Sequence, residues 1–94
     1  MVNRWELDLI FTALGDPLRR DVLQRLASGV LTVGDLAAPY TISLPGFLKH
    51  LKLLEQAGLV TRHKDGRTVH VRLNKKALRE AAEWLNQQTG RPNT

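Results

Sequence analysis

The sequence contains no cysteine and no long apolar run. The first absence excludes disulfides, thiolate metal sites and cysteine nucleophiles together, and it suits a reducing cytoplasm. The second excludes a membrane-spanning helix, which needs about 18 or more consecutive apolar residues. Glu6 and Asp8 interrupt the apolar N-terminal stretch, and no small-residue cleavage site follows it. We therefore expect a cytoplasmic protein with no signal peptide and no membrane association.

Patterns that support catalysis are missing as well. The sequence has no glycine-rich phosphate loop, no Ser-His-Asp order around a nucleophile turn, and no paired carboxylates in a predicted cleft. We expect neither an enzyme nor a cofactor. A chain of 94 residues forms one domain with a thin core, so a partner subunit would add stability.

Acidic residues are scarce in one half of the chain. Residues 1–48 carry four basic and five acidic side chains, whereas residues 49–79 carry nine basic and only two acidic ones. A concentrated positive surface suits a polyanion such as DNA, because counterions are released on binding. A solvated basic face that maintains solubility explains the charge alone equally well.

Apolar residues at helical spacing predict helices before this basic segment. The first covers residues 5–14. Asp16 and Pro17 begin the second, as cap and first helical residue, and Gly29 ends it. The segment LTVGDLA predicts a short third helix that begins at Thr32.

The fourth predicted helix covers residues 44–57, with Ser43 as its N-cap and Gly58 at its end. After Gly58, apolar and polar residues alternate, as they do in a β-strand. The segments LVTRHK and RTVHVRL predict a hairpin that turns at Asp65-Gly66. Asn74 would cap a last helix that reaches residue 88.

The predicted fold is mainly α with a small β-hairpin (α+β), in the order α-α-α-α-β-β-α. A short helix, a tight turn, a longer helix and a basic hairpin follow the winged helix-turn-helix plan. We expect residues 1–88 to form a DNA-binding and dimerisation domain and residues 89–94 a flexible tail.

The second helix of a helix-turn-helix reads the major groove from its N-terminal half. Here Phe47, Leu51 and Leu54 form the stripe to be buried, and basic residues lie beside it. The candidate DNA-contacting residues of this helix and the hairpin are Ser43, Leu44, Pro45, Gly46, Leu48, Lys49, His50, Lys52, Arg62, Lys64 and Arg67.

Four spaced segments, DPLRR, LTVGDLA, KHLKLLEQAGLV and KDGR, give the chain a family resemblance. Over roughly residues 11–85 it resembles the arsenical-repressor (ArsR-type) family of winged-helix regulators. The resemblance implies a homodimer built on the first and last helices, binding to operator DNA, and repression relieved by a signal.

The chain departs from the metal-sensing members of that family. Some carry cysteines in the segment matched by residues 31–36, which reads LTVGDL here, and others carry histidines on the last helix, which has none. We expect no metal site, and no release from DNA by zinc or arsenite. Control would then come from an organic ligand, a protein partner or the amount of repressor.

Several of these residues have a second interpretation. Leu48 stands where the family often has a small polar residue, and it either contacts a thymine methyl group or packs inward. His50 either contacts DNA or hydrogen-bonds within the wing or turn. Ser43 serves as a cap, a phosphate ligand or both. Arg62 and Arg67 either contact the DNA backbone or minor groove, or protect the edge of the hairpin.

Two further groups have structural alternatives. For Arg19 and Arg20, ion pairs with acids such as Asp16 compete with phosphate contacts. His63 and His70, expected as diagonal neighbours, suggest zinc, but no third ligand is evident.

The first and last predicted helices are apolar over more than one face. The residues proposed for a dimer interface are Trp5, Leu9, Leu78, Ala81, Ala82, Trp84 and Leu85, with Val2 beside them. A wide core contact within one subunit is the alternative. A winged helix used for protein–protein contact or RNA binding competes with operator recognition, although such domains often lack a basic recognition helix.

Overall fold

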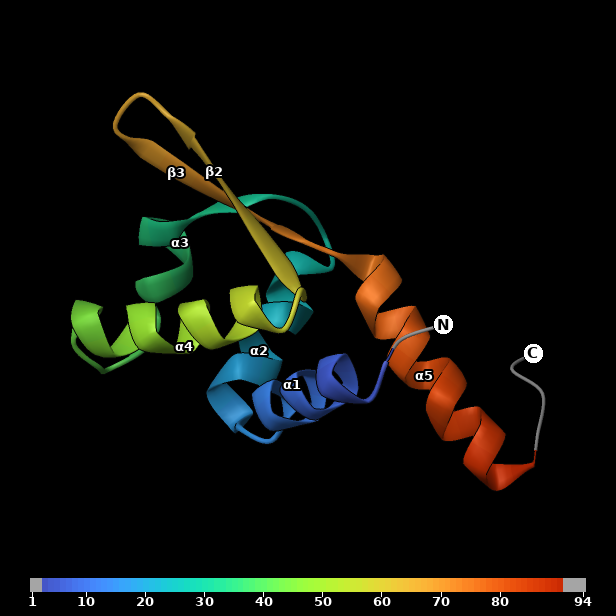
Figure 1. The fold of residues 1–94 in the computed structure, drawn as a ribbon. Coiled ribbons are helices and arrows are strands. Elements are labelled where there is room, and N and C mark those ends of the chain that lie inside the picture. The colour runs from blue at the N-terminus through green and yellow to red at the C-terminus, as the bar shows by residue number, and fades with distance from the viewer. Residues whose placement is uncertain (1–2, 91–94) are drawn as a thin grey trace.

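The computed structural model describes residues 3–90, so Val2 and the predicted tail residues 91–94 lie outside it. The described residues form five helices and three strands, and Figure 1 shows how the helices and the hairpin are arranged. In chain order they are α1 (Arg4–Leu14), α2 (Pro17–Leu26), β1 (Leu31–Thr32), α3 (Val33–Ala37), α4 (Leu44–Gln56), β2 (Val60–Asp65), β3 (Thr68–Leu73) and α5 (Lys75–Thr89). The predicted α+β winged helix-turn-helix is confirmed, with one additional strand. None of the helices within residues 3–90 has the length and apolar character needed to cross a membrane.

Side-chain caps set where most helices begin. The carboxylate of Asp16 accepts a hydrogen bond from the Arg19 backbone N–H at 3.1 Å, and Pro17 occupies the first helical turn, as predicted. The hydroxyl groups of Thr32 and Ser43 play the same part at the starts of α3 and α4. These short polar side chains satisfy backbone donors that have no partner within the helix.

Asn74 does not cap α5 with its side chain, and this prediction is wrong. It lies at the N-cap position, but its Nδ2 donates to the carbonyl of Gly58 at 2.8 Å. Its backbone N–H also donates to the Leu59 carbonyl at 2.8 Å. Asn74 therefore ties the start of α5 to the turn between α4 and β2.

The sheet has three antiparallel strands in the order β1-β3-β2. The sequence did not predict β1, in which Leu31 pairs with Val71 and Thr32 with His70. A two-residue strand is too short to show an alternating apolar pattern. It pairs because the chain must pass the edge of β3 before α3 begins.

The hairpin turn lies one residue later than predicted. Asp65 pairs with Thr68, so the two turn residues are Gly66 and Arg67. Gly66, the first turn residue, has a positive φ of 63°. Arg67, the second, does not have a positive φ, because within the described residues only glycines do. This combination is that of a type II′ turn. The shifted register places His63 directly opposite His70 instead of diagonally.

The core surrounds one face of α4. Phe47, Leu51 and Leu54 are buried as predicted, and α4 packs against α1, α2 and β2. The largest fully buried side chains come from every element except β1 and α5, and from the turn before β2: Ile10, Val22, Leu26, Leu36, Phe47, Leu51, Leu54, Leu59, Val60 and Val71. One small core therefore holds the first four helices and the base of the hairpin together.

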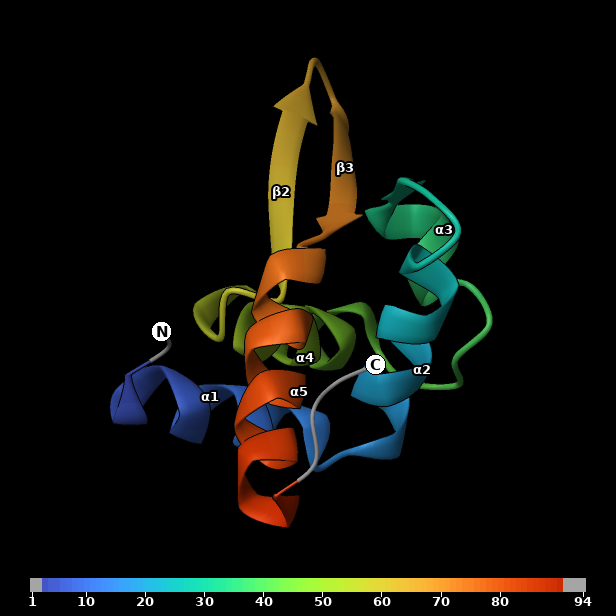
Figure 2. The same cartoon turned by 90° about the vertical axis from the view of Figure 1, so that its right-hand side faces the viewer.

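The hairpin and α5 extend away from this core in different directions (Figures 1 and 2). The tip of the hairpin projects past α3 and α4, while α5 crosses α1 near the other end of the molecule. Helix α5 runs through Thr89, one residue beyond the prediction, and Gly90 closes it in the left-handed conformation.

A matched pair of truncations tests this description of the core. Leu36→Ala removes a fully buried side chain and should lower the free energy of unfolding by about 2–5 kcal/mol. Leu53→Ala removes the same atoms from a side chain that is 38% exposed, so it should cost much less. Urea unfolding of the two variants measures the difference, and equal losses would contradict the assignment.

Candidate nucleic-acid interface

The outer face of α4 is fixed by the burial of its inner face. Because Phe47 and Leu51 point into the core, the residues between them in the helical turn point outward. Pro45, Lys49 and Lys52 are exposed on this side. The predicted basic face of the second helix is therefore free of contacts with the rest of the subunit.

The first turn of α4 offers few free donors. The Ser43 hydroxyl accepts from the Gly46 backbone N–H at 3.2 Å, and Pro45 has no N–H. Among the first three helical residues, only Leu44 keeps a backbone N–H without a partner in the described chain. The capping role of Ser43 is thus present in the structure, whereas a phosphate at this end would meet one free backbone donor.

Leu48 packs partly inward. Its half-buried side chain lies against the hydrophobic core. It also lines a hollow between the hairpin and α3, together with Gly34, Arg62 and Arg67. The inward packing predicted as one alternative for Leu48 is therefore present in part, and the side chain also borders this hollow.

The base of the hairpin is anchored to α4 by an ion pair. Arg62 donates from Nη2 to Glu55 Oε1 at 2.6 Å and from Nε to Oε2 at 3.2 Å. The Arg62 hydrogen bond lowers the pKa of Glu55, and the same bond raises the pKa of Arg62. This paired geometry is the preferred one for guanidinium and carboxylate. Arg62 is thus engaged by the protein in this structure, and the sequence did not identify Glu55 as its partner.

The other basic residues of the hairpin are exposed and make no ion pair within the described chain. Strand alternation places Lys64 on the same side of the hairpin as Arg62, which faces α4. Arg67, in the turn, lines the same hollow beneath the hairpin. Lys64 and Arg67 therefore share a side of the molecule with the recognition helix.

His50 lies against the start of α2. Its Nδ1 is 2.9 Å from Nη1 of Arg19 and 3.8 Å from Oδ2 of Asp16. Arg19 also donates from Nε to the Ala13 carbonyl at 2.7 Å and from Nη2 to the Thr12 carbonyl at 3.2 Å. This histidine thus hydrogen-bonds to α2, and not within the wing or turn as the predicted alternative to a DNA contact had it.

The predicted ion pairs of Arg19 and Arg20 with Asp16 are not formed. Their guanidinium groups bind backbone carbonyls instead, that of Leu14 in the case of Arg20, at 2.8 Å. Asp16 accepts from the backbone N–H of Arg19, and this hydrogen bond is the main cause of its lowered pKa. The last turn of α1 presents its carbonyls close to these side chains, and carbonyl oxygens of a helix end attract cations.

A second arginine network, which the sequence did not predict, holds α3 on α2. Arg25 donates to the carbonyls of Leu36 at 2.7 Å and Asp35 at 2.8 Å. Tyr40 donates to Asp21 at 2.5 Å, and the Arg25 guanidinium lies 5.5 Å from its ring. These contacts join residues ten or more positions apart, so no local pattern reveals them.

The predicted dimer residues lie along α1 and α5. Trp5 is 70% exposed, Leu85 49% and Trp84 38%. Ala81 is instead buried in the subunit's own core, and Leu78 packs against that core, so part of the intrasubunit alternative is correct. Leu9 and Ala82 are half-buried.

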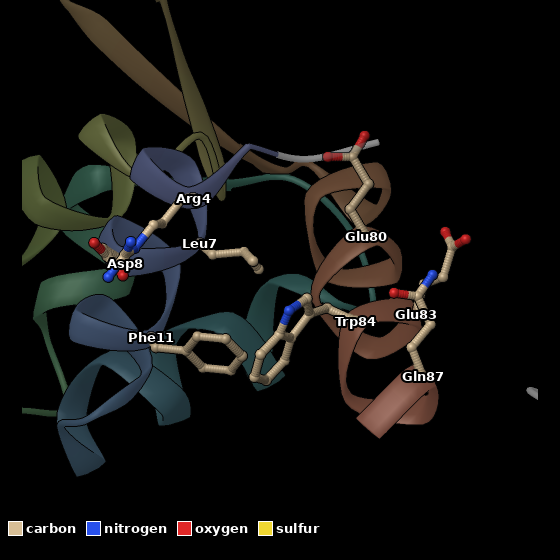
Figure 3. Close-up of a pocket in the computed structure, with 8 residues that line it drawn as sticks. All are labelled: Arg4, Leu7, Asp8, Phe11, Glu80, Glu83, Trp84 and Gln87. Carbon is tan, nitrogen blue, oxygen red and sulfur yellow. The ribbon is translucent and has the colours of Figure 1, made fainter. Parts of the chain in front are cut away.

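A groove separates α1 and α5 on this side of the molecule. Figure 3 shows Phe11 and Trp84 pointing toward each other, with Leu7 above them. The two rings meet edge to face, with centroids 5.7 Å apart. Glu80 and Glu83 lie along its α5 side.

His63 and His70 are cross-strand partners on the opposite side of the hairpin from Arg62. Within residues 3–90, no three His, Asp or Glu side chains converge as metal ligands would. The pair has no third ligand in the described chain.

Comparison with known proteins gives a consistent picture. Residues 14–63 match the model of a helix-turn-helix domain family. The chain is 36% identical over 76 residues to the transcriptional repressor SdpR of Bacillus subtilis, covering 81% of this chain and 84% of the relative. It is 34% identical over 89 residues to an arsenical resistance operon repressor of Staphylococcus xylosus, covering 95% and 82%. The crystal structure of an ArsR family transcriptional regulator superposes with a TM-score of 0.90 at 39% identity, covering 95% of this chain and 92% of that one.

The Glu55–Arg62 pair predicts a dependence on pH. Since the folded-state pKa of Glu55 is lowered, the pair stabilises the protein above the usual pKa of 4.5 and loses this contribution as the pH falls below it. Glu55→Gln should therefore lose less stability than the parent between pH 6 and pH 4, by a few tenths of a kcal/mol. Thermal unfolding at both pH values measures this. Glu83→Gln, on the exposed side of α5, is the control and should follow the parent.

Proposed function

The chain belongs to the ArsR-type family of winged helix-turn-helix transcriptional regulators, and from this premise we propose that it represses transcription by binding operator DNA as a homodimer. In this proposal, α4 enters the major groove and the β2–β3 hairpin follows the adjacent backbone. Residues 1–88 act as one DNA-binding and dimerisation domain.

One observation supports DNA binding most strongly: the exposed basic side chains of α4 and the hairpin lie on one side of the molecule. Lys49 and Lys52 extend from α4, and Lys64 and Arg67 extend from the hairpin that Arg62 anchors to it. Cations on two elements match the two phosphate strands that border a groove. A basic surface that served only solubility would not require the cations of α4 and those of the hairpin to lie on the same side.

Within this surface, we assign base reading to α4 and backbone contacts to the hairpin. Lys49 is exposed on the N-terminal half of α4, where a recognition helix meets base edges. Pro45 and Leu44, which is 55% exposed, offer apolar contacts to thymine methyl groups. Lys64 and Arg67 would contact phosphates.

Dimerisation rests on the outer faces of α1 and α5. Of the fifteen residues of α5, only Ala77 and Ala81 are buried, while Trp84 and Leu85 remain exposed. A second copy related by a two-fold axis would cover these side chains and Trp5 of α1. Burial of such apolar area offsets the thinness of the core.

The DNA proposal is tested by a gel shift with the DNA upstream of the gene, over a range of salt concentrations. Binding should weaken steeply with salt, because several cations contact phosphates. Lys49→Ala and Arg67→Ala should each lower affinity by about three- to tenfold without unfolding the domain. Lys76→Ala removes the same charge from α5 and should bind like the parent.

Two results of this experiment would contradict the proposal. If both variants bound like the parent, the assignment of α4 and the hairpin would be wrong. If duplex DNA did not bind at all, while a protein or an RNA did, the competing winged-helix function would replace it. Lys49→Ala should change sequence preference only if this lysine reaches a base.

The dimer is tested by Leu85→Asp. A carboxylate placed at each side of a two-fold interface is desolvated without a partner, so the dimer dissociation constant should rise by about 100-fold or more. Sedimentation at micromolar concentration distinguishes dimer from monomer. Val30→Asp, at a 43% exposed side chain that borders the hairpin strands, is the control and should leave the dimer intact. A stable monomeric parent would refute the proposal.

A further inference from the structure

Arg19 is held in place by three acceptors from two parts of the chain. Its Nε and Nη2 donate to the carbonyls of Ala13 and Thr12, at the end of α1. Its Nη1 lies 2.9 Å from Nδ1 of His50, in the middle of α4. The guanidinium plane is thus set by the α1 carbonyls, and its third nitrogen, Nη1, reaches the recognition helix.

This contact places a donor in front of one nitrogen of the His50 ring. A guanidinium group only donates hydrogen bonds, so Nδ1 of His50 must accept and carries no proton. This geometry is the one made by a ring that carries its proton on Nε2. Asp16, the carboxylate nearest to this nitrogen, is 3.8 Å away and too distant to compete as a hydrogen-bond partner.

The proton-bearing nitrogen faces outward. Nε2 of His50 has no hydrogen-bond partner within residues 3–90. No buried side-chain nitrogen or oxygen of the described residues lacks a partner, so an unpartnered Nε2 must be accessible to solvent. The side chain is 28% exposed and follows Lys49, which is fully on the surface of α4.

We propose that His50 is a neutral hydrogen-bond donor to the operator backbone, and that Arg19 is the positioning residue that holds it in the Nε2–H tautomer. The inference rests on the proposed DNA binding and adds a contact that carries no charge. A metal-bound histidine ring is oriented in the same way, by the partner of its other nitrogen. Here the α1–α2 junction supplies that partner.

A neutral donor has a distinctive effect on binding. Losing a phosphate contact made by a cation lowers affinity and reduces the salt slope by about 0.9. Losing a neutral hydrogen bond lowers affinity by about fivefold and leaves the slope unchanged. The slope therefore separates a contact by His50 from a contact by Arg19 itself.

Arg20 provides the matched control. It follows Arg19 in α2, carries the same charge and also donates to a backbone carbonyl of α1, that of Leu14, but it does not touch His50. Arg19→Met and Arg20→Met each remove one guanidinium group from the same turn. Only the first removes the donor that faces Nδ1.

The experiment has two parts. Nitrogen-15 NMR of the free protein reads the His50 tautomer in the parent, Arg19→Met and Arg20→Met. Salt-dependent titration with the upstream duplex then measures these proteins, His50→Asn and the Arg19→Met/His50→Asn double variant. The side-chain oxygen of asparagine can still accept a hydrogen bond from Arg19, but asparagine lacks the Nε2–H of histidine. Thermal unfolding confirms that each variant is folded at the assay temperature.

We expect the Nε2–H tautomer in the parent and in Arg20→Met, and a mixture of tautomers in Arg19→Met. His50→Asn and Arg19→Met should each bind about fivefold more weakly with the parent's salt slope, and the double variant no more weakly than His50→Asn. An Nδ1–H ring in the parent, parent-like affinity of His50→Asn, or a slope reduced by Arg19→Met would overturn the proposal. A parent that binds no duplex would instead refute DNA binding, while the NMR result would still report the tautomer.

Discussion

The burial of the inner face of α4 is the constraint on which the rest of the structure depends. Phe47, Leu51 and Leu54 fill the centre of a small core, and their burial fixes the rotation of the helix about its axis. Lys49 and Lys52 are thereby held on the opposite side. Two polar contacts then fix its flanks: Glu55 binds the hairpin through Arg62, and His50 meets α2 through Arg19. Hydrophobic packing thus orients the helix, and hydrogen bonds position its neighbours.

The positive charge of the chain is divided between two uses. Arginines at positions 19, 20, 25 and 62 donate to carbonyls or carboxylates of the protein itself. Within residues 3–90, no lysine side chain forms a hydrogen bond or an ion pair, and most lie in the basic second half of the chain. The planar guanidinium group suits fixed acceptors, whereas lysine loses less by remaining solvated. The net charge therefore overstates how many cations are free to meet DNA.

Helix α5 is attached to the core mainly near its start. It is fastened at its start by Asn74 and by two buried alanines, and the apolar side chains further along remain exposed. In the proposed homodimer, this exposed face becomes an interface. The same helix would then join two DNA-binding surfaces at a fixed separation, as a two-fold operator requires.

The sequence by itself determined the helices, their caps at Asp16 and Ser43, the basic segment and the winged plan, because each of these depends on residues a few positions apart. It did not determine strand β1, the turn at Gly66-Arg67, or the side chain of Asn74, since these depend on what the chain meets elsewhere. Nor did it show that Arg62 binds Glu55, or that Arg19 binds His50, 31 positions away. Only tertiary structure decided these pairings, because a side chain's partner is set by the packing that brings distant segments within hydrogen-bond distance.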